Sequence, residues 1–368
     1  MRLGKSRLVQ TMALLAATAA LAIGVGCSST PKAEDRPLDA DPPGPVEVGK
    51  KEAKRPAGLD DAVELVKAGK FADAIPKLRK ALEEEPKSAE AAFYLGMSIE
   101  QTGGDKKEAE AMYKQALAFD PKLIEAANNL AAIYLEEPPR PDQAIPVLSK
   151  ALSNEPDNVP LLTNLGYAYG LKGDIPQASK AYEAAIAKEP SPQLLFSYGT
   201  MLFENKQPEK AAPHLAKAAE GLDDVPTLVT IARMLGPGKA FTDCVKVLDK
   251  AIGKKGDVAE FYVRRGLCKH ELDQEKEASL DFEQAIKIDP KFQAAHYYLG
   301  VSLMAQKNAG RGKQELKKAW ELGKDTPIGK QAKDKLDGKK PDAKAPEGKP
   351  PAGGGKPAPP APPPPPKK

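Results

Sequence analysis

Few residues of this chain have both the type and the spacing that catalysis or metal binding would need. Its three histidines, His214, His270 and His296, have no partner at metal-ligand spacing such as His-Glu-x-x-His. Residues 236–239, with the sequence GPGK, lack the full G-x-x-x-x-G-K-[ST] spacing of a phosphate-binding loop. We therefore expect no catalytic residue, metal ion, cofactor or small-molecule substrate, and we expect the histidines at the surface or in a binding groove.

The element that would position any site is a 34-residue unit, residues 159–192. Apolar and small residues recur in it at helical spacing in two runs, which Gly173 and Asp174 separate. Pro176 lies in the first turn of the second run, where a missing N–H costs nothing, and Pro190 ends that run. The marker residues are Leu162, Leu165, Gly166, Tyr169, Ala178, Tyr182, Ala185 and Ile186. The unit is predicted to be a helix–turn–helix hairpin, which needs neighbours because a single hairpin cannot bury its own apolar face.

This order of markers, Leu-Gly, then Tyr, Ala, Tyr, Ala and Pro, resembles the tetratricopeptide repeat family. The resemblance implies an all-α, right-handed α-solenoid in which about eight hairpins stack over residues 55–324. It also implies a concave groove that normally binds other proteins. Thr326 and Pro327 begin a further amphipathic helix, residues 325–337, which we expect to cap the array.

Several repeats depart from the pattern, and the fifth is one residue short at its start. The second has one extra residue in its turn at Gly103 and Gly104, and the sixth has residues 236–238 at the end of its first helix, which should shorten that helix. Cys244 and Cys268 occupy small positions of the adjacent sixth and seventh repeats. We expect two packed thiols at these positions, with a disulfide as the alternative that the sequence leaves open.

The N-terminus has the features of an export signal. Residues 1–26 combine a basic start with an apolar run that is too short to predict a membrane span. The sequence GVGC, ending at Cys27, resembles the cleavage box of bacterial lipoproteins, in which the cysteine is lipidated, although Gly24 stands where leucine is usual. An ordinary secretory signal cut near Cys27 is the alternative. No Asp follows Cys27, which by the same resemblance favours the outer membrane, facing the periplasm, over the inner membrane.

The segments that flank the array are polar and rich in proline. Residues 27–54 are predicted to be a flexible tether, and residues 338–368 a disordered Pro/Lys-rich tail. Binding to a proline-recognising partner or an anionic polymer is the alternative for the tail. The net charge of +4 falls to +1 when Arg2, Lys5 and Arg7 are removed with the signal. Because the array shows no clustered basic face with aromatics, we do not expect nucleic acid as a partner.

By the family resemblance, the first helix of each hairpin lines the concave side of the array. The inward residues would include Tyr94, Met97, Asn128, Asn129, Asn164, Tyr167, Phe196, Arg233, Arg264, Tyr297 and Tyr298. Aromatic, Asn and Arg side chains can hold an extended segment by stacking and by hydrogen bonds to its backbone, although packing between repeats is the alternative role. The positions around Asn129 and Asn164 carry no charge, so a carboxylate clamp is not predicted.

These features predict a non-catalytic, lipid-anchored scaffold that binds envelope proteins or peptide segments. Relatives of this build assist the assembly of secretion, pilus, outer-membrane or polysaccharide-export machines, and the resemblance implies a role of that kind. The alternative is a regulatory or targeting subunit of a peptidoglycan enzyme, with the Pro/Lys-rich tail reaching the wall. The sequence identifies neither the partner nor the oligomeric state.

Overall fold

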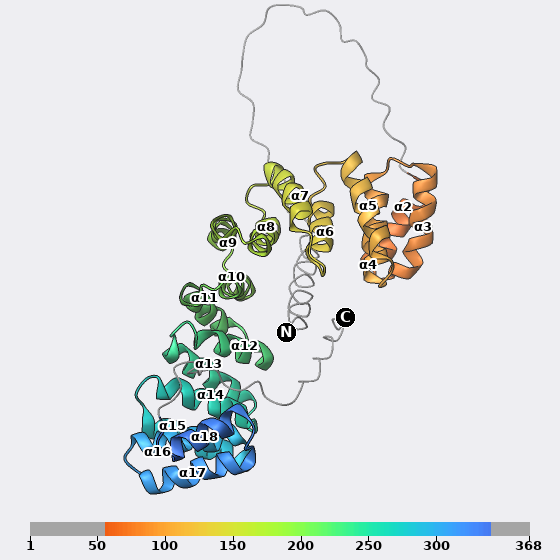
Figure 1. The fold of residues 1–368 in the computed structure, drawn as a ribbon. Coiled ribbons are helices and arrows are strands. Elements are labelled where there is room, and N and C mark those ends of the chain that lie inside the picture. Colours follow the sequence, from red (N-terminus) through yellow and green to blue (C-terminus); the bar gives the residue numbers. More distant parts are fainter. Residues whose placement is uncertain (1–55, 340–368) are drawn as a thin grey trace, which may run out of the picture. The chain divides into compact units, whose positions relative to one another are not determined.

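The structure of this protein, a computed structural model, describes residues 56–339. Within this range the chain forms seventeen α-helices and no strand (Figure 1). The helices are α2 (Leu59–Lys67), α3 (Phe71–Glu84), α4 (Ala89–Gln101), α5 (Lys106–Phe119), α6 (Ile124–Leu135), α7 (Pro141–Asn154), α8 (Val159–Lys172), α9 (Ile175–Lys188), α10 (Pro192–Glu204), α11 (Pro208–Gly221), α12 (Val225–Leu235), α13 (Phe241–Lys254), α14 (Ala259–His270), α15 (Glu275–Ile288), α16 (Gln293–Ala305), α17 (Ala309–Leu322) and α18 (Pro327–Leu336). The predicted all-α fold is therefore confirmed.

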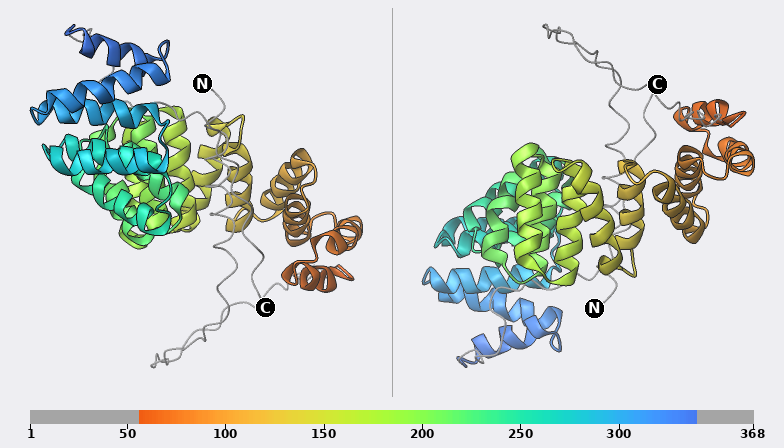
Figure 2. Two further views of the ribbon diagram at one scale, coloured as in Figure 1. Left: turned by 90° about the horizontal axis from the view of Figure 1, so that it is seen from below. Right: turned by 90° about the horizontal axis from the view of Figure 1, so that it is seen from above.

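The helices pair in chain order into eight hairpins, from α2 with α3 to α16 with α17. Within each of two compact units, one ending at Pro190 and one beginning at Ser191, successive helices lie side by side (Figure 2). The last helix, α18, packs Ile328 and Ala332 against α16 and α17, as expected of a cap. The sequence predicted one array, because the repeat pattern continues past Pro190 with one residue missing at the start of the fifth repeat.

Local sequence signals begin or end several of the helices. Side chains at several N-caps accept a hydrogen bond from a backbone N–H of the first turn, which replaces a bond that the helix cannot make internally. These N-caps are Ser88, Asp105, Asn158, Asp174, Ser191, Asp224 and Thr326. Gly173 ends α8 with a φ of 83°, a left-handed conformation that favours glycine. The predicted shortening of the sixth repeat is also present, because α12 ends at Leu235 after 11 residues.

In several hairpins the two helices approach each other at a glycine. A Cβ on Gly166 would come within 2.6 Å of the Tyr182 ring, and a Cβ on Gly199 within 2.6 Å of Leu215. In both hairpins the large residue stands sixteen positions after the glycine. Between Gly96 and Tyr113 the separation is seventeen positions, because the turn of the second repeat has one extra residue. Because glycine has no side chain, the large residue fills the space between the two helices and is fully buried.

Several predictions lie outside the described residues. The signal at residues 1–26, the lipidation site Cys27, the tether up to residue 54 and the tail beyond residue 339 are among them. Among the helices of residues 56–339, none combines the length and the apolar character needed to cross a membrane.

Candidate partner-binding surface

Some first helices of successive hairpins contact each other within a unit. Contacts join α2 to α4, α6 to α8 and α14 to α16, and α16 also contacts α18. In these pairs, side chains of one first helix lie close to side chains of the next first helix. We call the side chains predicted for the groove on these helices the first-helix surface. Its residues in one unit are Tyr94, Met97, Asn128, Asn129, Asn164 and Tyr167, and in the other Phe196, Arg233, Arg264, Tyr297 and Tyr298.

Two of the predicted asparagines bond to each other. Asn164 donates from Nδ2 to Oδ1 of Asn128 at 2.8 Å, and each side chain is only 8% exposed. This bond joins α6 to α8 and occupies one donor and one acceptor of the pair. Both residues lie on the predicted helices, and their contact supports the packing role that the sequence left as an alternative.

Asn129 belongs to a polar chain that reaches into the hairpin core. Its Nδ2 donates to Oη of Tyr113 at 3.2 Å, and Tyr113 donates to Oε2 of Glu100 at 2.8 Å. Burial raises the pKa of the Glu100 carboxyl, and Glu136 raises it further, although the Tyr113 and Lys106 contacts act in the opposite direction. Burial and the nearby Glu100 also raise the pKa of Tyr113. The sequence analysis missed Glu100 because its helix position alone does not show a tyrosine within reach.

Tyr94, Met97 and Tyr167 are half-buried and pack against the core of their unit. The Tyr94 ring lies 5.1 Å from the Phe93 ring, centroid to centroid. Each of the three side chains thus has one part in the core and another part at the surface, a division typical of residues that support a neighbour and contact a partner.

In the second unit, burial separates the predicted residues into two groups. Arg264 and Tyr297 are each 9% exposed, and Arg264 donates from Nε to Glu260 at 2.9 Å. Tyr298 stacks on Phe282 with centroids 5.9 Å apart, and burial raises its pKa to about 12. Phe196 is half-buried, whereas Arg233 is exposed. Of these residues, Arg233 offers a partner the most accessible charge.

The histidines have separate environments. His296 is only 6% exposed, so the expectation of a surface or groove position is wrong for this residue. It bonds from Nδ1 to Glu315 at 2.7 Å and from Nε2 to the carbonyl of Pro290 at 3.0 Å. His214 lies on the Tyr198 ring, with centroids 4.4 Å apart. Among residues 56–339 no three His, Cys, Asp or Glu side chains form a group that suits a metal ion.

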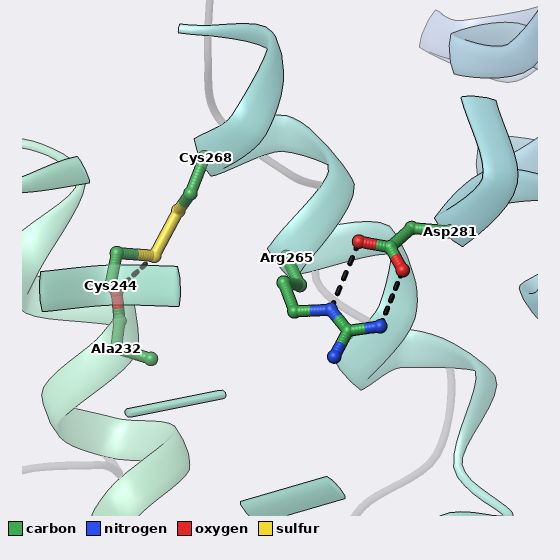
Figure 3. The surroundings of a disulfide bond; sticks show 5 residues. All are labelled: Ala232, Cys244, Arg265, Cys268 and Asp281. Carbon is green, nitrogen blue, oxygen red and sulfur yellow. Dashed lines mark hydrogen bonds and ion pairs between the residues drawn. A yellow bond between two sulfur atoms is a disulfide. The ribbon is translucent and has the colours of Figure 1, made fainter. Parts of the chain in front are cut away.

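Cys244 and Cys268 form a disulfide, and the expectation of two packed thiols is wrong (Figure 3). Their Cα atoms are 6.3 Å apart, within the range that a disulfide spans. The small positions of adjacent repeats were recognised in the sequence, but the distance between α13 and α14 was not available from it. One turn before Cys268 on α14, Arg265 donates a hydrogen bond from Nε to the carboxylate of Asp281 at 3.0 Å (Figure 3). A covalent bond and an ion pair thus join three consecutive helices.

Comparison with known proteins gives matches over separate parts of the chain. Family models described as tetratricopeptide repeat match residues 59–124, 163–226 and 259–292. The chain is 35% identical over 89 residues to photosystem I assembly protein Ycf3 of Cyanophora paradoxa, which covers 24% of this chain and 51% of the relative. It is 30% identical over 145 residues to the protein O-mannosyl-transferase Tmtc3 of Drosophila melanogaster, and this match covers 39% of this chain and 15% of the relative. The chain therefore spans about half or less of the length of these relatives.

Solved structures match the helical array. A protein of Thermus thermophilus described as a thermophilic TPR protein has 24% sequence identity and a TM-score of 0.39. That match covers 48% of this chain and 97% of the other. Yeast Tom70 has 16% identity and a TM-score of 0.41, with 74% of this chain and 59% of the other covered.

Proposed function

Because the chain belongs to the tetratricopeptide repeat family, whose members mediate protein–protein interactions and assembly, we propose that it is a non-catalytic scaffold. In this proposal, the first-helix surface binds a partner protein or an extended peptide segment. The supporting observation is that half-buried side chains recur on the first helices, some of which contact each other. Such an arrangement offers aromatic contact area and polar groups at regular intervals, as recognition of an extended chain requires.

The proposal places this scaffold in the cell envelope, attached through a lipid on Cys27 and facing the periplasm from the outer membrane. The sequence of residues 1–27 supports export. The Cys244–Cys268 disulfide supports it independently, since disulfides persist in oxidising compartments and are rare in the cytosol. If Cys27 carries the lipid, Cys27→Ala should move the protein from the membrane fraction to the soluble periplasmic fraction. Retention in the membrane fraction would contradict the anchor without affecting the binding proposal.

Assistance in building an envelope machine is the finer proposal. It is supported by the family's role in assembly, and one relative is itself named as an assembly protein. The partner would be a subunit of a secretion, pilus, outer-membrane or polysaccharide-export machine. Crosslinking from native membranes, followed by affinity capture and mass spectrometry, identifies that subunit.

The same capture tests the binding surface with two matched pairs of variants. Arg233→Glu changes an exposed residue of a first helix, and Lys217→Glu makes the same charge change on the second helix α11. Tyr167→Ala removes a first-helix ring, and Tyr169→Ala removes the same ring two residues later, about 200° around α8. We expect Arg233→Glu and Tyr167→Ala to lower the recovery of the partner at least about tenfold, the size of a binding hot spot.

The two control variants should retain the partner. A thermal melt of each variant separates lost binding from lost folding, because Tyr167 also packs against the core. If all four variants recover the same proteins in the same amounts, the first-helix surface is not where partners bind.

A further inference from the structure

The last hairpin and the cap have an excess of basic side chains that the repeat pattern does not require, and the expectation that the array lacks a basic cluster with an aromatic is wrong for this part. Residues 307–339 contain ten Lys and Arg and five Asp and Glu, a net charge of +5. Six of the lysines are exposed, and no hydrogen bond or ion pair within residues 56–339 joins them to an acidic side chain. They are Lys307, Lys313, Lys318, Lys324, Lys330 and Lys335, and we call them the C-terminal basic surface.

This charge is local. Residues 56–190, the described part of the other unit, contain fifteen Lys and Arg and twenty-two Asp and Glu, so their net charge is −7. The basic excess continues in the sequence beyond α18, where residues 340–368 add six lysines and two acidic residues. Positive charge is thus concentrated in residues 307–368. This charge pattern favours a partner with an extended anionic surface.

The only tryptophan of the chain, Trp320, lies within the same surface. It is half-buried on α17 and packs partly against the core of the cap. The ammonium groups of Lys324 and Lys333 lie 5.1 and 5.2 Å from the centre of its ring. A tryptophan beside lysines is typical of protein surfaces at a membrane interface, where the ring enters the headgroup region and the ammonium groups contact phosphates.

The arrangement suits an extended surface better than a small ligand. The six lysines are distributed over α17, α18 and the adjoining turns, and their side chains are exposed. Adsorption to a dense layer of phosphates needs only that many ammonium groups are close to it at once, and each lysine near such a layer strengthens adsorption roughly fivefold. Six unpaired lysines are therefore enough for measurable adsorption.

We propose that the C-terminal basic surface, with Trp320, adsorbs to the surface of an anionic phospholipid bilayer. This inference rests on the proposed envelope location, because that location provides the bilayer. It adds to the lipid anchor a second attachment, formed by α17, α18 and the adjoining turns. In this arrangement the first helices remain for a protein partner.

Trp320 makes the test specific to this surface. The chain beginning at Ser28, so that neither the signal nor a lipid contributes, is mixed with vesicles of neutral phosphatidylcholine or of phosphatidylcholine with phosphatidylglycerol. We expect co-sedimentation with the anionic vesicles alone, a shift of Trp320 emission to shorter wavelength, and quenching of that emission by brominated lipid. High salt should release the protein, because screening weakens attraction between exposed charges.

Two charge-matched variants separate the surface from net charge. The test variant changes Lys318, Lys324, Lys330 and Lys335 to Glu, and the control changes Lys210, Lys217, Lys255 and Lys287, which are exposed elsewhere in the same unit. The test variant should bind anionic vesicles at least about tenfold more weakly than the control. Equal loss in both variants, or no shift of Trp320 emission, would overturn the proposal, as would retention on heparin or on an acidic protein without binding to vesicles. Capture of the protein partner by the test variant, measured in parallel, reports separately on the scaffold function.

Discussion

Gly266 lies against the ring of Phe282, sixteen residues further along the chain, so closely that a Cβ on the glycine would come within 2.6 Å of the ring edge. The contact joins α14 to α15, and Phe282 is only 1% exposed. Three ring atoms of Phe282 lie within 3.0 Å of the missing methyl group. The hairpin therefore depends on the absence of a side chain at Gly266.

Gly266→Ala should destabilise the protein by about 1–3 kcal/mol, the usual cost of placing an extra methyl group in a packed core. Gly253→Ala is the matched control, since Gly253 is an exposed residue of helix α13 with no atom within 4 Å of the added Cβ. The control should be neutral or more stable by up to about 1 kcal/mol, because alanine favours helix. Urea unfolding of both variants measures the difference, and equal stabilities would contradict the packing argument.

The sequence predicted this hairpin because its signals are local. The glycine, the large residue sixteen positions later and the proline near the end of each unit all act within one repeat, as in the pair Gly166 and Tyr182. The division between Pro190 and Ser191 was not predicted, because the repeat pattern continues through it with only one residue missing at the start of the fifth repeat.

The candidate surface could be predicted only in part, because side-chain partners come from other repeats. The helix position of Asn164 could be predicted, but its bond to Asn128, thirty-six residues earlier, could not. Likewise, the composition of α16 does not show that Glu315 of α17 lies beside His296. Periodicity shows which face of a helix is buried, whereas the identity of a polar partner depends on the distance between helices.

Reduction of the Cys244–Cys268 disulfide should lower the stability of the protein. The bond closes a segment with a sequence separation of 24 and joins α13 to α14, so its loss should cost about 2–4 kcal/mol. Thermal melts with and without dithiothreitol measure the effect, and mass spectrometry after alkylation counts the free thiols. Cys244→Ala with Cys268→Ala should melt near the reduced wild type and should not respond to the reductant. A wild-type melt that is unchanged by complete reduction would contradict this.

Arg265→Met should destabilise the second unit because it leaves the carboxylate of Asp281 buried without its closest cation. Asp281 is 4% exposed and accepts two hydrogen bonds from Arg265, at 2.5 and 3.0 Å. Lys269 remains 2.8 Å away, so we expect a loss of about 2–3 kcal/mol, below the full cost of an unpaired buried charge.

Arg311→Met is the control for this pair. Arg311 also pairs with a carboxylate, that of Glu283 at 2.7 Å, but this arginine–carboxylate pair is exposed. Its loss should cost no more than about 1 kcal/mol. Chemical denaturation of both variants provides the comparison, and a loss in Arg311→Met as large as in Arg265→Met would show that burial does not set the cost.

His296 should make the protein less stable as the pH rises above about 6.5 and through the raised pKa of its ring. Burial opposes the charged form of its ring, but the bonds to the Glu315 carboxylate and the Pro290 carbonyl outweigh burial and raise the pKa of His296 above its ordinary value. Both bonding atoms are acceptors, which favours the ring with both nitrogens protonated. A folded-state pKa above the unfolded value of about 6.5 adds stability that is complete below about pH 6.5 and is lost as the pH rises through the folded pKa. The free energy of unfolding of wild type and His296→Gln should therefore differ more at about pH 6 than at about pH 8.5, and Glu315→Gln should flatten the wild-type dependence. Parallel curves for wild type and His296→Gln over that range would show that the His296 imidazolium does not contribute to stability.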